Sequence, residues 1–402
     1  MSKSKLVVFL NNHKRDLYWV LPVLLFCFIM VASSWHVPMW MDEYIFYRLS
    51  SGLPNYSATS DWLFKDRPST INPMDTWNDK TDLPLDRNAS LHWVYDNKVY
   101  GHGPLAPVLC WPIVKTLNTM ADKGWIAHIE DQLGYPVVSS NITDIDMQKL
   151  NSTMNAETIT KILRFIPILL FAISMWLIYK IMYRKVGSSA AVFAIPVTTG
   201  IQLLSGVYLF YWDVWMMFFL VLTLYLMERK SKWAYLTACC MVNTKLFVGL
   251  IFLLPLVVKN WKMVFTGLSL VPFYLAIAYV NGDIWYPLIH YGTGAGMNLH
   301  NYVYHLYDLK GYGLLIVSLG IPFFLAMTIP IFWRIKKYPE YVVLLIAANL
   351  YAWGSGLGMT HLSSLVYVGA LIFPLVFCEF NLYPKFYKIF SFFNFNKGAS
   401  KD

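Results

Sequence analysis

Two adjacent carboxylates stand at the exit of the first hydrophobic segment. Asp42 and Glu43 follow that segment in the stretch WHVPMWMDEYIFYRL, among tryptophans and tyrosines. Charges at a bilayer edge are usually basic anchors, so an acidic pair there suggests chemistry. Neighbouring helical residues project about 100° apart, so the two carboxylates cannot share one role. One acting as a base, with its neighbour structural or substrate-binding, fits this spacing. A solvated loop entry is the plainer alternative.

Several cations could stabilise a negative leaving group near such a base. Arg164 opens a hydrophobic run, Lys245 interrupts another, and His361 begins the last. His102 lies in the long polar loop. Charges within apolar runs are functional by default, although Arg164 could equally be an interfacial anchor and His361 a helix cap. Asp213 could hold Arg164 or Lys245, orient a metal, or cap a helix.

The composition indicates the kind of molecule that must position these residues. The chain has 402 residues, of which 57% are hydrophobic and only 14% charged, whereas a soluble protein carries about a quarter charged residues. We therefore predict an all-α polytopic membrane protein. The net charge is +9, and the basic residues lie between hydrophobic segments. This placement indicates topology signals and not nucleic-acid binding. The five cysteines show no metal-ligand spacing.

Hydrophobic runs divide the chain into membrane segments. They begin near Leu17, Ile159, Ser188, Trp212, Trp233, Met263, Tyr312, Tyr341 and Leu362. Basic clusters between the runs all fall on the cytoplasmic side if the N-terminus is cytoplasmic. This holds on one condition, that the run from Trp233 to Val258 is two segments. We then expect about ten membrane segments, with both termini cytoplasmic.

The run WAYLTACCMVNTKLFVGLIFLLPLVV contains a polar interruption, Asn243-Thr244-Lys245. A turn there gives a hairpin whose arms are about 20 Å long, shorter than the roughly 30 Å hydrocarbon core. Lys245 would then lie within the membrane thickness, facing protein or a watery cavity. A single tilted helix with one snorkelling lysine is the alternative.

One membrane domain accounts for the whole chain, 1–402. We predict a first span at 16–35, an external loop with interfacial helices at 36–157, the remaining spans at 158–380 and a basic cytoplasmic tail at 381–402. Within the loop, Gly101 to Leu117 is apolar but short and interrupted by proline. It is therefore expected to lie along the membrane interface. No internal repeat and no second soluble domain are evident.

In these features the chain resembles the GT-C glycosyltransferases. Within them it is most similar to the protein O-mannosyltransferases and the aminoarabinose transferases of lipid A. The likeness lies in the Asp-Glu pair before a long external loop, in YGHGPLAPVL, in LRFIPILLF, in the stretch around Asp213, and in VNTKLFVG. YGHGPLAPVL is similar to a Lys-Pro-Pro-Leu segment, and VNTKLFVG to a Leu-Thr-Lys-Gly turn.

Two positions depart from that family's pattern. Gly103 stands where relatives carry a lysine before Pro-Leu, with His102 one step earlier. Ile45 replaces the arginine that often follows the Asp-Glu pair, and Arg48 is the nearest substitute.

The resemblance implies transfer of one sugar from a polyprenyl-phosphate-sugar donor to a hydroxyl of a glycan, lipid or protein at the external face. Asp42 would be the general base of an inverting displacement, and Glu43 would bind the acceptor or brace the helix. The expected phosphate-binding residues are Arg164, Lys245, His361 and His102, with Asp213 and Arg48 in support. No cofactor is required, although a divalent metal is possible.

A multi-pass protein of the bacterial inner membrane, with its site on the periplasmic side, fits this reading best. An archaeal plasma membrane or the ER membrane is the alternative. Two rival functions remain. A lipid-linked sugar flippase or transporter would be expected to carry paired inverted repeats. A glycan polymerase or ligase would not need an Asp-Glu pair at the first exit.

Overall fold

The structure is a computed structural model, and it describes residues 43, 46–47, 50–51, 103, 105–127, 158–186, 211–281, 284–285, 329–354 and 359–379. Within these ranges all regular secondary structure is helical, and no strand occurs. The predicted all-α fold is therefore confirmed for the described part of the chain. The first span and the runs that begin near Ser188 and Tyr312 lie outside it.

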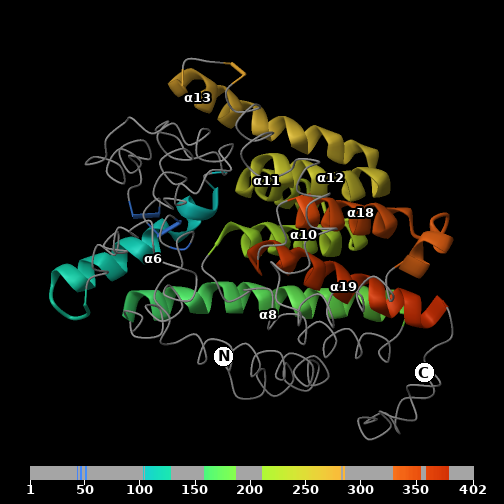
Figure 1. Cartoon of the computed structure of the whole chain (residues 1–402), viewed down its shortest axis with the longest axis horizontal. Helices are drawn as coiled ribbons and strands as arrows, with labels where there is room; N and C mark the ends of the chain where they lie inside the picture. Colours follow the sequence, from blue (N-terminus) through green and yellow to red (C-terminus); the bar gives the residue numbers. More distant parts are fainter. Residues whose placement is uncertain are drawn as a thin grey trace, which may run out of the picture.

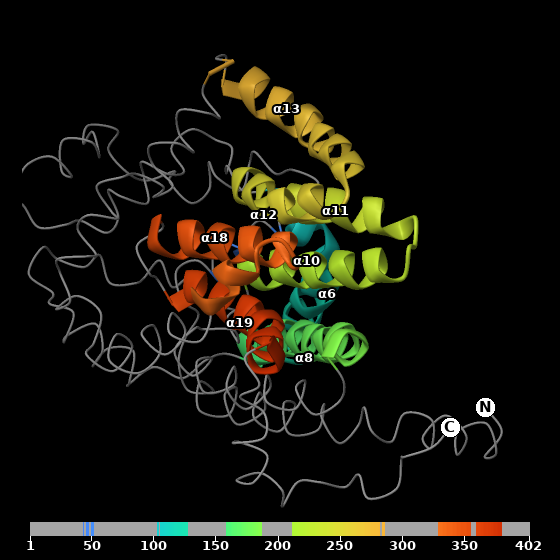
Figure 2. The same cartoon turned by 90° about the vertical axis from the view of Figure 1, so that its right-hand side faces the viewer.

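The described helices form a layered bundle (Figures 1 and 2). In chain order they are α6 (Leu105–Asp122), α8 (Thr158–Val186), α10 (Trp212–Glu228), α11 (Trp233–Thr244), α12 (Leu246–Lys259), the 3-10 helix η2 (Trp261–Leu270), α13 (Val271–Asn281), η6 (Ile329–Arg334), α18 (Pro339–Gly354) and α19 (Met359–Glu379). Helix α10 packs against α8 and α11, α12 packs against α18, and α19 packs against both α18 and α8.

The predicted hairpin is present. Helix α11 ends at Thr244, and α12 begins at Leu246. Lys245 between them has φ −142° and ψ 84°, which is not helical. The arms touch just beyond this turn, because a Cβ added to Gly249 would lie 2.7 Å from Cα of Val242. A side chain at that position would therefore push the two arms apart.

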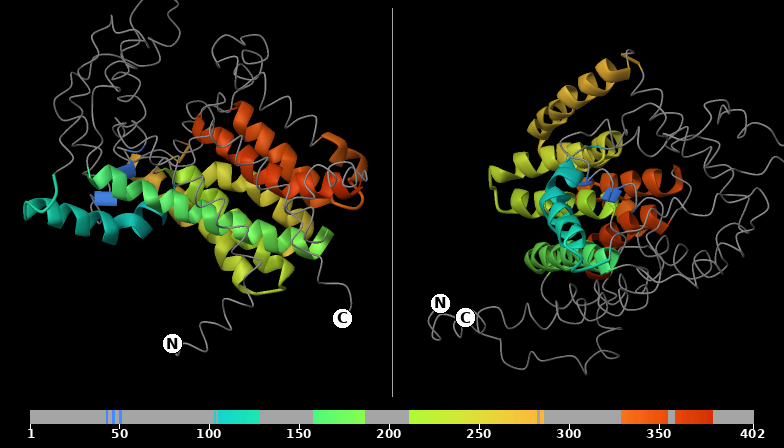
Figure 3. Two further views of the ribbon diagram at one scale, coloured as in Figure 1. Left: turned by 90° about the horizontal axis from the view of Figure 1, so that it is seen from below. Right: turned by 90° about the vertical axis from the view of Figure 1, so that its left-hand side faces the viewer.

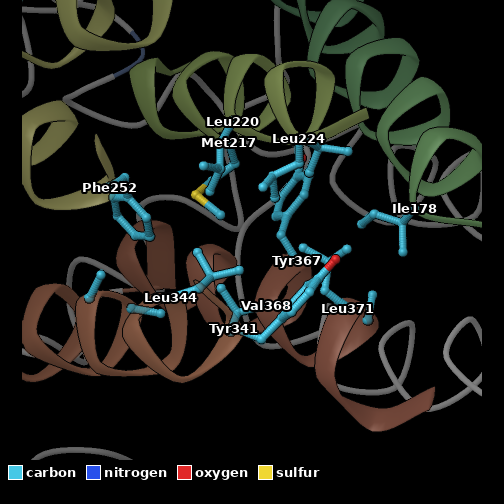
Figure 4. Packing of buried hydrophobic residues seen from close by; sticks show 14 of the residues in the cluster. Ile178, Met217, Leu220, Leu224, Phe252, Tyr341, Leu344, Tyr367, Val368 and Leu371 are labelled. Atoms are coloured by element: carbon cyan, nitrogen blue, oxygen red, sulfur yellow. The ribbon is translucent and has the colours of Figure 1, made fainter. Parts of the chain in front are cut away.

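Apolar side chains from six α-helices, together with Met263 and Leu270 of η2 and Ile331 of η6, fill the interior of the bundle. Leu220 and Leu224 of α10 face Val368 and Leu371 of α19 across the layer shown in Figure 4. Phe252 of α12 belongs to the same cluster, as do residues of α8, α11 and α18. One continuous core therefore holds together helices that are separated by up to about half of the sequence.

Ion pairs link the ends of α8, α10, α12, α18 and α19. Glu228, at the end of α10, binds Lys185 at 3.2 Å near the end of α8 and also binds Lys259 at the end of α12. Lys259 lies 3.7 Å from Glu340, in the first turn of α18. Glu379, the last residue of α19, binds the segment just before α18. These termini define one end of the bundle, on the right in Figure 1, which we call the basic end.

The basic end gathers every cationic cluster in the described chain that the sequence predicted to share one side. These residues are Arg184, Lys185, Arg229, Lys230, Lys232, Lys259, Lys262, Arg334, Lys336 and Lys337, while Lys180 of the first cluster lies six residues before the end of α8. Their common placement follows from the hairpin, because a single helix across 233–258 would send Lys259 to the opposite end. We call that opposite end, where α6 crosses the starts of α8 and α10, the α6 end (Figure 3).

One described helix, α8, is long and apolar enough to cross a bilayer. Shorter apolar helical stretches are Leu246–Lys259, Trp261–Ala276, Pro339–Tyr351 and Ser364–Val376. The expected interfacial segment forms α6, a helix of 18 residues that continues through Pro112 to Asp122.

Candidate functional site

A buried pair joins Glu43 to Arg164 at the α6 end. Nε of Arg164 donates to Oε1 of Glu43 at 3.0 Å, and Nη2 donates to Oε2 at 2.6 Å. The side chains are 0% and 1% exposed, respectively. Two parallel N–H bonds to one carboxylate fix position as well as charge. Glu43 therefore ties the exit of the first hydrophobic segment to the second turn of α8.

A second buried group surrounds Lys245. Its ammonium donates to Oδ2 of Asp213 at 2.9 Å and to the hydroxyl of Tyr351, which in turn donates to Oδ1 of Asp213. The three residues come from the hairpin turn, the first turn of α10 and the last part of α18. Each partner thus bonds the other two in a closed ring.

Aromatic rings complete the surroundings of this ammonium. Nζ of Lys245 lies 5.2 Å from the ring centre of Tyr211 and 4.9 Å from that of Tyr351. Aromatic faces attract cations, and more strongly where water is excluded. The side chain of Lys245 is only 4% exposed. The charge is therefore held by a carboxylate, a hydroxyl and the ring of Tyr211 at one point in the bundle.

The segment after Glu43 packs between α10 and α6. Phe46 meets Trp212 edge-on, with 4.6 Å between ring centres. The hydroxyl of Tyr47 donates to Oδ1 of Asn118 in α6 at 2.6 Å. Both aromatic side chains are buried. The exit of the first segment is therefore held by α8, α10 and α6 together.

The surroundings of Gly103 explain why this position does not carry the lysine found in the family that the sequence resembles. A Cβ at this position would lie 1.7 Å from the carbonyl oxygen of Asn243, in the last turn of α11. The carbonyl of Gly103 also accepts a bond of 3.3 Å from the indole of Trp212. There is no room for a lysine side chain here, because the backbone itself rests on the hairpin. Gly103 thus allows the start of α6 to pack against the hairpin turn, next to Lys245.

The structure places the predicted residues as follows. Glu43, Arg164, Asp213 and Lys245 all lie at the α6 end, in two separate pairs. Of the partners considered for Asp213, the observed one is Lys245.

The structure does not describe the side chains of four predicted residues. Asp42, Arg48 and His102 lie outside the described residues. His361 is in the first turn of α19, at the α6 end, but its side chain also lies outside them.

Tyr351 and Tyr211 were not predicted from the sequence. Tyr351 is one tyrosine within an apolar run that begins at Tyr341, and nothing in its spacing distinguishes it. Its polar partners lie 106 and 138 residues away, so only the packing of α18 against the hairpin reveals the role.

A metal centre is not evident in the described ranges, where no three His, Cys, Asp or Glu residues come together. The carboxylates of Glu43 and Asp213 are already engaged by Arg164 and Lys245.

Comparisons with known proteins give no further guide to the site. The chain matches no protein-family model, no curated protein and no solved structure.

Proposed function

We propose that this chain is a membrane glycosyltransferase of the GT-C kind. It would move one sugar from a polyprenyl-phosphate-sugar to a hydroxyl of a glycan, lipid or protein acceptor. The observation that carries the proposal is the buried Lys245, fixed by Asp213 and Tyr351 at the end opposite the basic clusters. Burying a cation in an apolar bundle is costly, so a residue of this kind usually serves a function.

The reaction releases a phosphate monoester, so negative charge develops on the leaving oxygen. Preorganised donors aimed at such charge are often the largest catalytic contribution. An ammonium has three N–H donors, of which Asp213 and Tyr351 take two. The third is assigned to the donor phosphate. Arg164, His361 and His102 are proposed to contact the donor phosphate from the same membrane depth, and Arg48 to support the acceptor side.

The general base is assigned to Asp42. Its neighbour Glu43 is committed to Arg164 through both carboxylate oxygens, which supports the bracing role and not the base. Asp42 would take the proton of the acceptor hydroxyl as that oxygen attacks the anomeric carbon. The bond from this carbon to the phosphate oxygen breaks, polyprenyl phosphate leaves, and the configuration inverts.

The proposed location is a membrane, with the α6 end external and the basic end cytoplasmic. Lysine and arginine between spans favour the cytoplasmic side. A bacterial inner membrane with a periplasmic site fits best, and no bound cofactor is needed beyond a possible divalent metal at the donor phosphate.

The decisive experiment compares Asp42→Asn with wild type against a panel of polyprenyl-phosphate sugars. Asp42→Asn keeps the shape and removes the base, so turnover should fall by about 10²–10⁴-fold while donor binding persists. The control is Glu379→Gln, which removes a carboxylate at the basic end and should leave turnover unchanged.

Two outcomes would change the proposal. A wild-type rate in Asp42→Asn together with an inactive Glu43→Gln would exchange the roles of the two residues. If the protein moved intact lipid-linked sugar across the membrane of vesicles and transferred no sugar to an acceptor, the flippase would be favoured. Buried charges are also expected in such a transporter.

A further inference from the structure

Exposed cations gather where α10 turns into α11 and where η2 begins. They are Arg229, Lys230, Lys232 and Lys262, which we call the cation cluster. The two segments are joined by a bond of 3.1 Å from the amide of Asn260 to the hydroxyl of Tyr235. Among the described residues no carboxylate lies within ion-pairing distance of any of the four. Lys185 and Lys259, by contrast, are neutralised by Glu228.

Lys230 occupies a position that glycine would fill with less strain. Its φ of 55° lies in the left-handed region. The N–H of Lys230 donates to the carbonyl of Met227 at 3.0 Å, and that of Ser231 donates to Leu226 at 2.9 Å. This is the Schellman motif that ends many helices, and its left-handed residue is usually glycine. This chain therefore carries a lysine at a backbone position that favours glycine.

Helix dipoles do not account for the cluster. Cations are favoured at the C-terminus of a helix, which fits Arg229 and Lys230 after α10. Lys232 and Lys262, however, stand at the starts of α11 and η2, where the dipole disfavours positive charge. The dipole therefore favours only two of the four cations, whereas a negative partner at the same surface would suit all four.

Two exposed tryptophans flank the cluster. Trp233 follows Lys232 and is 67% exposed, while Trp261 precedes Lys262 and is 63% exposed. Tryptophan is enriched at the level of the lipid headgroups. The four cations would therefore lie where phosphodiester groups are concentrated.

We propose that the cation cluster binds the phosphate of anionic phospholipid in the leaflet at the basic end. Each cation near such a surface contributes about 1 kcal/mol. The proposal rests on the membrane location given above, but not on sugar transfer. Charge complementarity selects an anionic headgroup over a zwitterionic one.

The test measures binding of fluorescent phosphatidylglycerol or phosphatidylcholine to the full-length chain in neutral detergent, with no sugar donor present. Wild type should prefer phosphatidylglycerol. Lys230→Asn, which removes the charge but suits a left-handed residue, should weaken that binding about fivefold, since one charge is lost. The triple variant Arg229→Gln, Lys230→Asn, Lys232→Gln should weaken it roughly 100-fold.

Two controls separate charge from folding. Lys230→Arg should retain the affinity. Lys230→Gly should lose affinity while its thermal midpoint rises, because glycine relieves the strain. Equal affinity for both lipids, or no loss in the triple variant, would overturn the proposal. So would full competition by inorganic phosphate, which would indicate a soluble anion. An inactive transferase that still prefers phosphatidylglycerol would refute the proposed function alone.

Discussion

The two ends of this bundle use the same kinds of charged residue in opposite ways. At the α6 end, the paired side chains of Glu43, Arg164, Asp213 and Lys245 are at most 4% exposed. At the basic end, Lys337 is 57% exposed and binds a glutamate that remains 14% exposed. Exposed pairs contribute little to stability, because solvent screens them. Buried pairs cost desolvation that their attraction barely offsets. The buried pairs therefore add little net stability, which is consistent with the functional role proposed for them.

The largest expected effect comes from separating Asp213 from Lys245. Asp213→Leu leaves a buried ammonium without its counter-charge and should lower the free energy of unfolding by about 3–5 kcal/mol. The double variant Asp213→Leu/Lys245→Met should recover most of that loss, because replacing a buried pair with apolar side chains is often neutral. Sugar transfer should nevertheless stay at least about 100-fold below wild type.

Thermal unfolding in detergent checks the predicted changes in stability of the Asp213 and Lys245 variants. Donor turnover, measured on the same samples, checks the predicted loss of sugar transfer. Glu228→Leu is the matched control at the basic end, where Lys185 and Lys259 still reach solvent, and its effect should be smaller. A double variant as unstable as the single one would show that the charge pair is not the origin of the loss. A double variant with normal turnover would remove Lys245 from the proposed mechanism.

A smaller effect is expected from closing the contact between α6 and the hairpin. Gly103→Ala places a Cβ 1.7 Å from the carbonyl oxygen of Asn243 and should cost about 1–3 kcal/mol, as overpacking does. Gly267→Ala is the control, because its Cβ would meet only the flexible ends of Leu250 and Leu253 at 3.3–3.4 Å. Equal thermal midpoints for the two variants would contradict the close contact between Gly103 and the carbonyl of Asn243.

The smallest effect is expected at the basic end. The hydrogen bond from Lys337 to the carboxylate of Glu379 raises the pKa of the Lys337 ammonium. A raised pKa gives stability that is complete below the unfolded value of about 10.4 and is lost as the pH rises through the folded value. Lys337→Met should lower the unfolding midpoint only slightly at neutral pH, because the pair is exposed and screened by solvent, and it should abolish the alkaline loss of stability. If Lys337→Met lowered the unfolding midpoint strongly at neutral pH, the exposed pair would matter as much for stability as the buried pairs, which would contradict this prediction.

Local signals in the sequence were sufficient for the hairpin and for the basic end. Three polar residues interrupt an apolar run at Asn243-Thr244-Lys245, and the chain reverses there. The cationic clusters that flank the hairpin then fall at one end, because α11 runs back from the basic end and α12 returns to it. Both features depend on residues close together in the chain, so pattern and length alone predict them.

The sequence also identified Glu43, Arg164, Asp213 and Lys245 as candidates, because charges in apolar runs are rare. It did not determine their pairing, and Asp213 had two possible cations. The partners are 121 residues apart in one pair and 32 in the other. Tyr351 and the need for glycine at position 103 were equally hidden. Such contacts arise only when distant helices pack, since burial then requires each polar group to find a partner within reach. The sequence by itself thus determined which residues carry charge into the bundle, and the tertiary structure decided which of them meet.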